Sequence, residues 1–266
     1  MNISPLELAG VFIFGSLVGS FLNVCIWRIP AEEQVVKGRS HCRSCGKMIA
    51  WFDNIPLLSW AVLGGRCRNC KAAISWSYPF VELATGLLFA GVVARFGWSW
   101  EALVYAALAA ALVMVSMIDL AEMILPDEVT LPGLGIGLLL SFLLPQLHGE
   151  LMPWKGLLAG LIGAVAGGGF LWAIGAIGTW LFKKEAMGFG DVKLMAMVGA
   201  IIGLWKVLLV NMVLAPVLGA LVGVALKLRT GREIIPFGPF LAIGTLVALF
   251  WGDPIIAWYR SLLTGV

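Results

Sequence analysis

Two aspartates at the edges of apolar segments are the residues of this chain best placed to do chemistry. Asp191 follows Gly188 and Gly190 and precedes Lys193 in the sequence Gly188-Phe-Gly-Asp-Val-Lys193. The apolar segment 194–209 comes directly after this motif. Asp119 ends another apolar segment, 103–118. An ionisable group beside a hydrophobic span is costly to keep, so such residues are functional candidates. The alternative for Asp191 is a helix N-cap, a position that Asp favours.

A pair of neighbouring aspartates would have a definite chemistry. Two carboxylates that share a site cannot both ionise cheaply, so one stays protonated and the pair can hold a water. The ionised member takes a proton from the water as it attacks a peptide carbonyl, and the protonated member donates a hydrogen bond to the carbonyl oxygen. This is peptide hydrolysis without a metal or a covalent intermediate. We expect His41 beside a cysteine cluster and His148 on the outer face, so a serine–histidine mechanism is excluded.

Two further acidic residues compete with Asp119. Asp127 follows Leu125-Pro126 and precedes an apolar segment, so it is interpreted as the cap of that helix, where the helix dipole favours negative charge. Glu122 lies in the connecting turn and is expected to be solvated. Asp119 is preferred because it is still attached to an apolar helix.

The composition predicts an integral membrane protein, with the lipid bilayer as a partner. The chain has 266 residues, of which 61% are hydrophobic and 12% are charged, whereas ordinary globular chains carry about 25% charged residues. The mean hydropathy is +0.97. The net charge is only +3, so nucleic acid is not expected as a partner.

The fold class predicted is an all-α polytopic membrane protein with about eight transmembrane helices and a small cytoplasmic zinc-binding loop domain. A transmembrane helix needs about 20 apolar residues. The expected spans are 6–29, 79–96, 100–118, 128–147, 155–182, 191–208, 209–227 and 236–258. The weakest boundary is at Val210-Asn211, and seven spans with a re-entrant segment is the alternative. Three parts are predicted: a first helix at 1–30, a zinc module at 31–78 and a protease bundle at 79–266.

The basic residues predict the orientation in the membrane, because lysine and arginine concentrate in cytoplasmic loops. With eight spans, 14 of the 18 basic residues fall on the side that holds the 31–78 loop. The other side holds Arg95, Lys155, Lys206 and Arg260. The first side is therefore cytoplasmic, and both termini lie outside the cytoplasm. The same parity places Asp119 and Asp191 together at the cytoplasmic face.

The 31–78 loop has the cysteine spacing of a structural zinc site. Two C-x-x-C pairs are separated by 21 residues, which approximates a four-cysteine site. The ligands would be Cys42, Cys45, Cys67 and Cys70. Gly46 and Gly64-Gly65 would permit the tight backbone. Two disulfides are the alternative, which a reducing cytoplasm disfavours. His41 is expected in the second shell or in solvent, and Cys25 as a small buried hydrophobe.

Several motifs in order resemble those of a known family. Gly188-Phe-Gly-Asp191 resembles the G-x-G-D motif of intramembrane aspartyl proteases. The following stretches together resemble the bacterial type IV prepilin peptidases, also called leader peptidase and N-methyltransferase: Gly19-Ser-Phe-Leu-Asn-Val24, Arg28-Ile-Pro30, the paired C-x-x-C knuckles around Asp53-Asn-Ile-Pro-Leu-Leu-Ser59, Tyr78-Pro-Phe-Val-Glu82, Ile118-Asp119, Leu125-Pro126-Asp127 and Gly188 to Lys193. The resemblance covers nearly the whole chain.

The resemblance implies a function and a location. The catalytic pair would be Asp119 and Asp191, in a multi-pass protein of the bacterial inner membrane. The substrates would be type IV prepilins or type II secretion pseudopilins, which lose a short basic leader on the cytoplasmic side. The new N-terminal residue, usually Phe, would then be methylated from S-adenosylmethionine. The methyl-transfer site would lie near the zinc module with Gly65 contributing, and a simple turn glycine is the alternative for that residue.

Two other classes of function are compatible with this composition. A transporter could carry ions or protons through Asp119 and Asp191, but both are expected at one face, whereas transporter sites usually lie near the midplane. A zinc-bearing scaffold of a secretion assembly would have no activity. Cleavage of a prepilin-like peptide distinguishes the protease from both.

Overall fold

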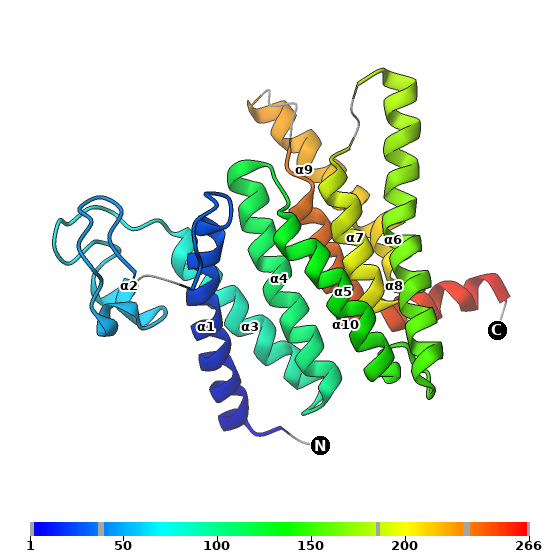
Figure 1. The fold of residues 1–266 in the computed structure, drawn as a ribbon, viewed down its shortest axis with the longest axis horizontal. Helices are drawn as coiled ribbons and strands as arrows, with labels where there is room; N and C mark the ends of the chain where they lie inside the picture. Colours follow the sequence, from blue (N-terminus) through cyan, green and yellow to red (C-terminus); the bar gives the residue numbers. More distant parts are fainter. Residues whose placement is uncertain (1–2, 37–39, 185–186, 231–234, 265–266) are drawn as a thin grey trace. The chain divides into compact units, whose positions relative to one another are not determined.

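The computed structural model describes residues 3–36, 40–184, 187–230 and 235–264. The chain forms two compact units, Met1–Met114 and Val115–Val266, and the boundary falls inside helix α4 (Trp100–Glu122) (Figure 1). Across the described ranges the regular structure is helical apart from two isolated β-bridges, which confirms the all-α prediction. The division of the chain into three functional parts, 1–30, 31–78 and 79–266, stays a prediction. The basic residues Lys37, Arg39 and Arg232 used for the orientation lie outside the described residues.

The first unit is built on two helices that pack closely, α1 (Pro5–Arg28) and α3 (Ser77–Phe96). Helix α1 begins with a capping box: the Ser4 hydroxyl accepts the Glu7 N–H, and the Glu7 carboxylate accepts the Ser4 N–H. A β-carbon added at Gly15 or Gly19 would meet α3 at 2.8 Å. The small residues of α1 therefore let the two backbones touch, as expected for close packing in membranes.

A polar module connects these two helices. It contains the short 3₁₀ helix η1 (Trp51–Asn54), the one-turn helix α2 (Leu58–Val62) and two isolated bridges, His41–Met48 and Arg66–Ala73. Each bridge closes a hairpin around one C-x-x-C pair. The module has no apolar core of its own in its described part, so its conformation depends on its cysteines and on the helices beside it.

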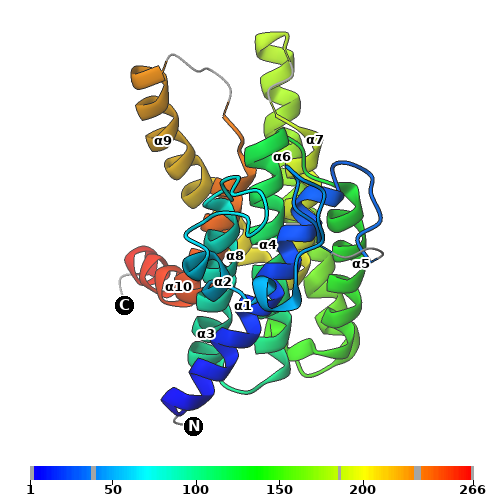
Figure 2. The same ribbon diagram turned by 90° about the vertical axis from the view of Figure 1, so that its left-hand side faces the viewer.

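The second unit holds the C-terminal turns of α4 and the remaining helices (Figure 2). These are α5 (Asp127–Leu143), η2 (Pro145–His148), α6 (Pro153–Phe182), α7 (Phe189–Ile202), α8 (Leu204–Leu209), the π-helical η3 (Val210–Leu214), α9 (Ala215–Thr230) and α10 (Gly238–Thr264). Helix α7 packs against α5 and α6, and the three together form the centre of the unit. The ends of α4, α6 and α9 and the starts of α5, α7 and α10 lie at the same end of the unit in Figure 1.

The predicted boundary between the sixth and seventh spans is wrong. The helix breaks at Gly203, not at Val210-Asn211, and Gly203 has a φ of 81°, which ends α7. The chain then stays helical from Leu204 to Thr230, with only the π-turn η3 at the expected boundary. Hydropathy did not locate this break, because apolar residues flank Gly203 directly on both sides and the charged Lys206 lies three residues further on.

Six described helices are long and apolar enough to cross a membrane, so the chain is a multi-pass membrane protein. Helices α5 and α7 have 17 and 14 residues, fewer than the roughly 20 that a perpendicular crossing needs. The count of eight spans therefore stays a prediction. Helix α6 has 30 residues, about 45 Å at 1.5 Å per residue, which exceeds the hydrocarbon thickness of about 30 Å.

A contact between two glycines fixes the position of α7. A β-carbon added at Gly163 of α6 would overlap the Gly199 carbonyl of α7, whereas Gly169 on the same helix has only an ordinary contact at 4.0 Å. We expect Gly163→Ala to separate α6 from α7 and to lower the unfolding temperature in detergent, and we expect Gly169→Ala to leave it unchanged. The cost should be about 1–3 kcal/mol, typical of overpacking. Equal unfolding temperatures for the two variants would contradict this packing.

Candidate functional site

The two predicted aspartates lie together in the second unit. Asp119 is in the last turn of α4 and Asp191 is in the first turn of α7, and their side chains are 5% and 7% exposed. They are close enough for their charges to interact. The Asp119 Oδ2 accepts a hydrogen bond of 2.8 Å from the N–H of Gly238, at the start of α10. The Asp191 Oδ1 is buried and has no hydrogen-bond partner among the described residues.

The N-cap alternative for Asp191 is wrong. The N-cap of α7 is Gly188, no side chain caps this helix, and Asp191 is the third residue of the helix. Its backbone N–H bonds to the Gly188 carbonyl, so the side chain is not needed to satisfy the helix start. Asp191 is therefore buried in the first turn without a capping role.

The glycines around the aspartates allow three segments to converge. A β-carbon added at Gly190 would lie 2.8 Å from Leu125 Cβ, and one added at Gly238 would lie 2.7 Å from Asp119 Oδ2. Larger residues at either position would push the α4–α5 connection or α10 away from the carboxylates. Gly238 was not singled out in the sequence analysis, because it lies far from both aspartates along the chain.

The predicted role of Asp127 as a helix cap is also wrong. The N-cap of α5 is Pro126, and Asp127 is the first helical residue without a capping hydrogen bond. Both Asp127 carboxylate oxygens instead accept hydrogen bonds of 2.7 Å from the Nζ of Lys193. Lys193 follows Asp191 by two residues on α7, so this ion pair joins the start of α5 to the turn that carries Asp191. Glu122 is exposed, as expected.

A serine and a histidine do meet, although no such pair was expected. The Ser141 Oγ lies 2.9 Å from the His148 Nε2, and also within hydrogen-bonding distance of the Gly137 and Ala200 carbonyls. Ser141 is fully buried, so a substrate cannot reach its hydroxyl. These contacts hold the end of α5 against η2 and α7.

The four predicted cysteine ligands form a cluster in the first unit. Their sulfur atoms all lie within 4.8 Å of one another, and the Sγ atoms of Cys42 and Cys70 are 3.7 Å apart. A tetrahedral zinc site with Zn–S bonds of about 2.3 Å has sulfurs about 3.8 Å apart. All four cysteines are free thiols, so the two-disulfide alternative is wrong. The cluster is therefore built to bind a metal ion.

Two hairpins of matching geometry present these cysteines. Cys42 N–H bonds to the Lys47 carbonyl and Cys67 N–H to the Ala72 carbonyl, and a second bond closes each turn four residues after the first cysteine. That closing residue has a left-handed backbone in both hairpins: Gly46 with φ 69° and Lys71 with φ 58°. The predicted glycine positions, Gly46 and Gly64-Gly65, all have positive φ, and Lys71 adopts the same strained conformation in the second hairpin.

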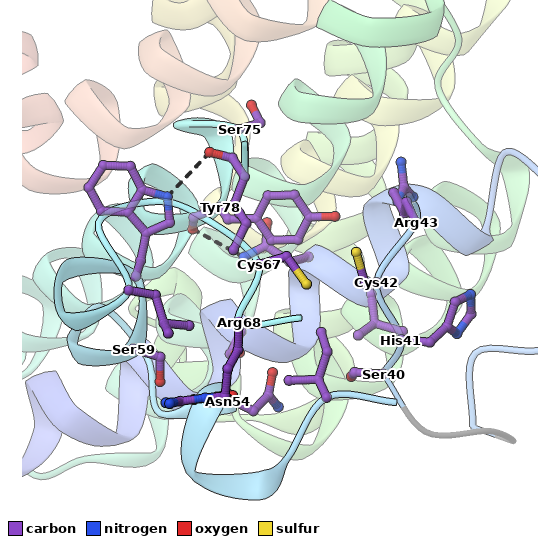
Figure 3. A pocket seen from close by; sticks show the side chains of 18 of the residues that line it. Ser40, His41, Cys42, Arg43, Asn54, Ser59, Cys67, Arg68, Ser75 and Tyr78 are labelled. Atoms are coloured by element: carbon purple, nitrogen blue, oxygen red, sulfur yellow. Dashed lines mark hydrogen bonds and ion pairs between the residues drawn. The ribbon is translucent and has the colours of Figure 1, made fainter. Parts of the chain in front are cut away.

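The backbone around Cys42 favours the ionised form of this thiol. The N–H groups of Cys45 and Ser44 point at the Cys42 sulfur and lower the pKa of its thiol to about 6, whereas desolvation and the neighbouring thiols raise the pKa of Cys70 to about 11. A thiol must ionise to ligate a metal, so Cys42 is the member of this pair that is in its ligand form near neutral pH. The His41 ring points away from the Cys42 sulfur in Figure 3, and His41 is not a member of the four-sulfur cluster.

A cavity of about 940 Å³ opens in the first unit, between the cysteine hairpins and the facing turns of α1 and α3 (Figure 3). The rings of Trp27, Trp60 and Tyr78 line it, together with the carboxyl group of Glu82. Glu82 was quoted above only as part of a motif. Its position inside the apolar segment 79–96 is the same signal that identified Asp119.

Gly65 lies behind the wall of this cavity. Its φ is 66°, and a β-carbon at this position would lie 2.8 Å from the indole of Trp60. Trp60 in turn packs on Trp76 with ring centroids 4.0 Å apart and donates its Nε1–H to the Ile74 carbonyl. Gly65 therefore shapes the turn and supports Trp60, while its part in methyl transfer stays a prediction.

These features define a polytopic membrane protein with a four-cysteine module and a pair of buried aspartates. One family model, the bacterial Peptidase A24 N-terminal domain, matches residues 13–96, and another, the type IV leader peptidase family, matches residues 106–224. The chain belongs to the type IV leader peptidase family.

Several curated proteins are similar to this chain over most of its length. The chain is 40% identical to the prepilin leader peptidase/N-methyltransferase of Aeromonas salmonicida, over 95% of this chain and 94% of that protein. The protein of the same name from Pseudomonas aeruginosa is 40% identical, with 93% and 91% covered. That of Myxococcus xanthus is 42% identical, with 86% of this chain but 65% of that protein covered. No solved structure matches the chain.

The ion pair between Asp127 and Lys193 gives a prediction about stability. We expect Asp127→Asn and Lys193→Gln each to lower the free energy of unfolding by up to about 1 kcal/mol, because the pair is partly exposed. The double variant should cost no more than one single variant, since either change removes the same interaction. Chemical denaturation in detergent measures the cycle. Fully additive losses would show that the two residues do not act as a pair.

Proposed function

We propose that Asp119 and Asp191 are the catalytic pair of a prepilin peptidase and that they act together on one water. As a member of the leader peptidase family, the chain is a membrane aspartyl endopeptidase that also methylates its product. The observation that supports these two residues is their convergence: two buried carboxylates from helices far apart in sequence interact at one end of the second unit. No metal is required for this step.

The surroundings of the two carboxylates suggest different roles. The Gly238 N–H donates to Asp119 Oδ2, and a hydrogen bond of this kind favours the ionised form of a carboxyl group. Asp191 has a buried oxygen without a protein donor among the described residues, which favours the neutral acid. Asp119 is then the base that takes a proton from water, and Asp191 donates a hydrogen bond to the scissile carbonyl.

The substrates we propose are type IV prepilins and type II secretion pseudopilins, cut at the cytoplasmic face of the bacterial inner membrane. Both termini are placed outside the cytoplasm, because 14 of the 18 basic residues fall on the side of the cysteine module. S-adenosylmethionine supplies the methyl group for the new N-terminal residue. A buried carboxylate pair at one end of the unit is less suited to a transporter, whose sites usually lie at the midplane.

We propose that the metal is a structural zinc held by Cys42, Cys45, Cys67 and Cys70. The sulfur separation of 3.7 Å supports a tetrahedral four-thiolate site. Four thiolates leave no open coordination position, so the zinc would organise the module and take no part in hydrolysis. The module has little apolar core, and metal binding would replace the missing burial energy.

The catalytic pair gives a prediction about rate and pH. We expect Asp119→Asn and Asp191→Asn each to lower the rate of prepilin cleavage by roughly 10²–10⁴-fold, the usual worth of general acid–base catalysis. The double variant should lose little more, because the two residues act as a unit. Wild-type cleavage should be bell-shaped in pH, since gain and loss of one shared proton both inactivate the pair. Cleavage of a synthetic prepilin in detergent measures all of these.

Glu122→Gln is the matched control, since Glu122 is an exposed carboxylate on the same helix as Asp119. It should keep full activity. Full activity in a folded Asp191→Asn variant would show that the wrong carboxylates have been chosen. Both Asp→Asn variants should still methylate a pilin that has already been cleaved.

The cysteine cluster gives a prediction about metal content. Gently purified protein should contain one zinc per chain, and Cys45→Ser should lose it because three thiolates bind zinc far more weakly than four. Cys25→Ala should keep its zinc, since this buried cysteine lies on α1 and outside the four-sulfur cluster. Elemental analysis measures both. Less than half a zinc per chain in wild-type protein would contradict the assignment.

A further inference from the structure

The cavity of the first unit contains three carboxyl groups, and they differ in what neutralises them. Glu33 is exposed to solvent. Asp53 forms a bidentate ion pair with Arg68, at 2.6 and 2.7 Å, which holds the pKa of Asp53 below its ordinary value. Glu82 is 8% exposed and has no ion pair with any lysine or arginine in the described ranges. Glu82 is therefore the carboxyl group that lacks a counter-ion.

The structure is arranged to keep Glu82 at the cavity wall. Its Oε2 accepts a hydrogen bond of 2.8 Å from the Leu57 N–H, and the Ser20 hydroxyl of α1 also interacts with it. A β-carbon at Gly19 would lie 2.8 Å from the Glu82 Cα, so a glycine is required on α1 for the helices to meet here. A buried carboxyl group with hydrogen bonds but no cation is costly to ionise, and a bound cationic ligand would offset that cost.

The backbone that serves Glu82 is strained. Leu57 has φ 62° and ψ −48°, a conformation that non-glycine residues rarely adopt. This conformation aims the Leu57 N–H at Glu82 at the start of α2. Strain of this kind persists where the surroundings enforce it, and it often marks a ligand site.

We propose that Glu82 binds the α-ammonium group of the cleaved pilin and accepts its proton when the amine is methylated. The proposal rests on the proposed function, which requires a site where a free N-terminal amine meets a methyl donor. An ammonium group supplies the positive charge that Glu82 lacks. The cavity volume of about 940 Å³ falls in the range of roughly 300–1,000 Å³ for small-molecule sites. The Arg43 guanidinium covers the Trp27 ring at 3.2 Å, so Trp60 and Tyr78 are the aromatic lining residues left for the base of the donor.

Methylation at this site needs removal of a proton from the amine before the methyl group is transferred. The ammonium proton moves to the Glu82 carboxylate and leaves a neutral amine with a lone pair. That lone pair forms the N–C bond to the methyl carbon, while the C–S bond of the sulfonium breaks and its electron pair stays on sulfur, giving a neutral thioether. The methylated amine carries the positive charge, and Glu82 releases its proton to solvent. The chain itself supplies the anchor and the proton acceptor.

The first test measures binding without turnover. The probes are a synthetic peptide with the N-terminal sequence of a mature pilin, beginning with Phe, and the same peptide N-acetylated. Wild-type protein with S-adenosylhomocysteine present should bind the free-amine peptide at least 10-fold more tightly than the acetylated one, as measured by calorimetry in detergent. Glu82→Gln should lose this preference while its affinity for S-adenosylhomocysteine stays within about twofold. Equal binding of both peptides to wild-type protein overturns the proposal, whatever the variants do.

The second test uses the pH dependence of methylation of a precleaved pilin. An α-amine loses its proton unaided with a pKa of about 7.7–8.0, so a proton acceptor matters most below that range. Glu82→Gln should be at least 50-fold slower than wild type near pH 6.5, and the defect should shrink near pH 9. A Glu82→Asp variant should keep part of the activity, and Glu101→Gln, a carboxyl group of the first unit away from the cavity, should keep all of it. A defect in Glu82→Gln that is the same at both pH values shows a structural role and overturns the proposal.

Cleavage separates failure of this inference from failure of the proposed function. All the Glu82 variants should cut prepilin at the wild-type rate, because the aspartate pair belongs to the other unit. Wild-type protein that cuts prepilin but never methylates it would refute the methyl-transfer half of the proposed function. Wild-type protein that performs both reactions with an unimpaired Glu82→Gln would refute the role of Glu82 alone.

Discussion

The cost of burying a carboxyl group in apolar helices is the constraint on which both units depend. Asp119 and Glu82 are each more than nine-tenths buried, and each receives one backbone N–H from a distant segment. Gly238 provides it for Asp119 and Leu57 for Glu82. A side-chain cation would fix the charge permanently, whereas a single N–H leaves the group able to exchange a proton.

Close backbone contacts make this arrangement possible. Helix α1 reaches α3 at Gly19, beside Glu82, and α6 reaches α7 at Gly163 and Gly199, which sets the position of the helix that carries Asp191. In a bilayer, apolar side chains gain little by leaving lipid, so helices associate through close packing and polar contacts. The same glycines that bring helices together therefore determine where the carboxyl groups stand.

The two units contain different sets of functional side chains. Among its described residues, the first contains a four-cysteine cluster, an aromatic cavity and one buried carboxyl group without a counter-ion. The second contains the aspartate pair and the ion pair of Asp127 with Lys193. The described side chains of each set lie within one unit. Under the proposed function, cleavage therefore belongs to the second unit and methylation to the first.

The sequence by itself determined the membrane class, the helical fold, the cysteine cluster and the family. These depend on composition, spacing and motif order, which are local properties of the chain. Only the tertiary structure decided that the helix break is at Gly203, that Asp127 pairs with Lys193, and that Gly238 and Leu57 donate to the buried carboxyl groups. The ion pair and the two hydrogen bonds join residues far apart in the chain, and no local pattern of hydrophobicity or charge records which of them meet. The break at Gly203 depends on a backbone angle, which the hydropathy of the flanking residues does not record.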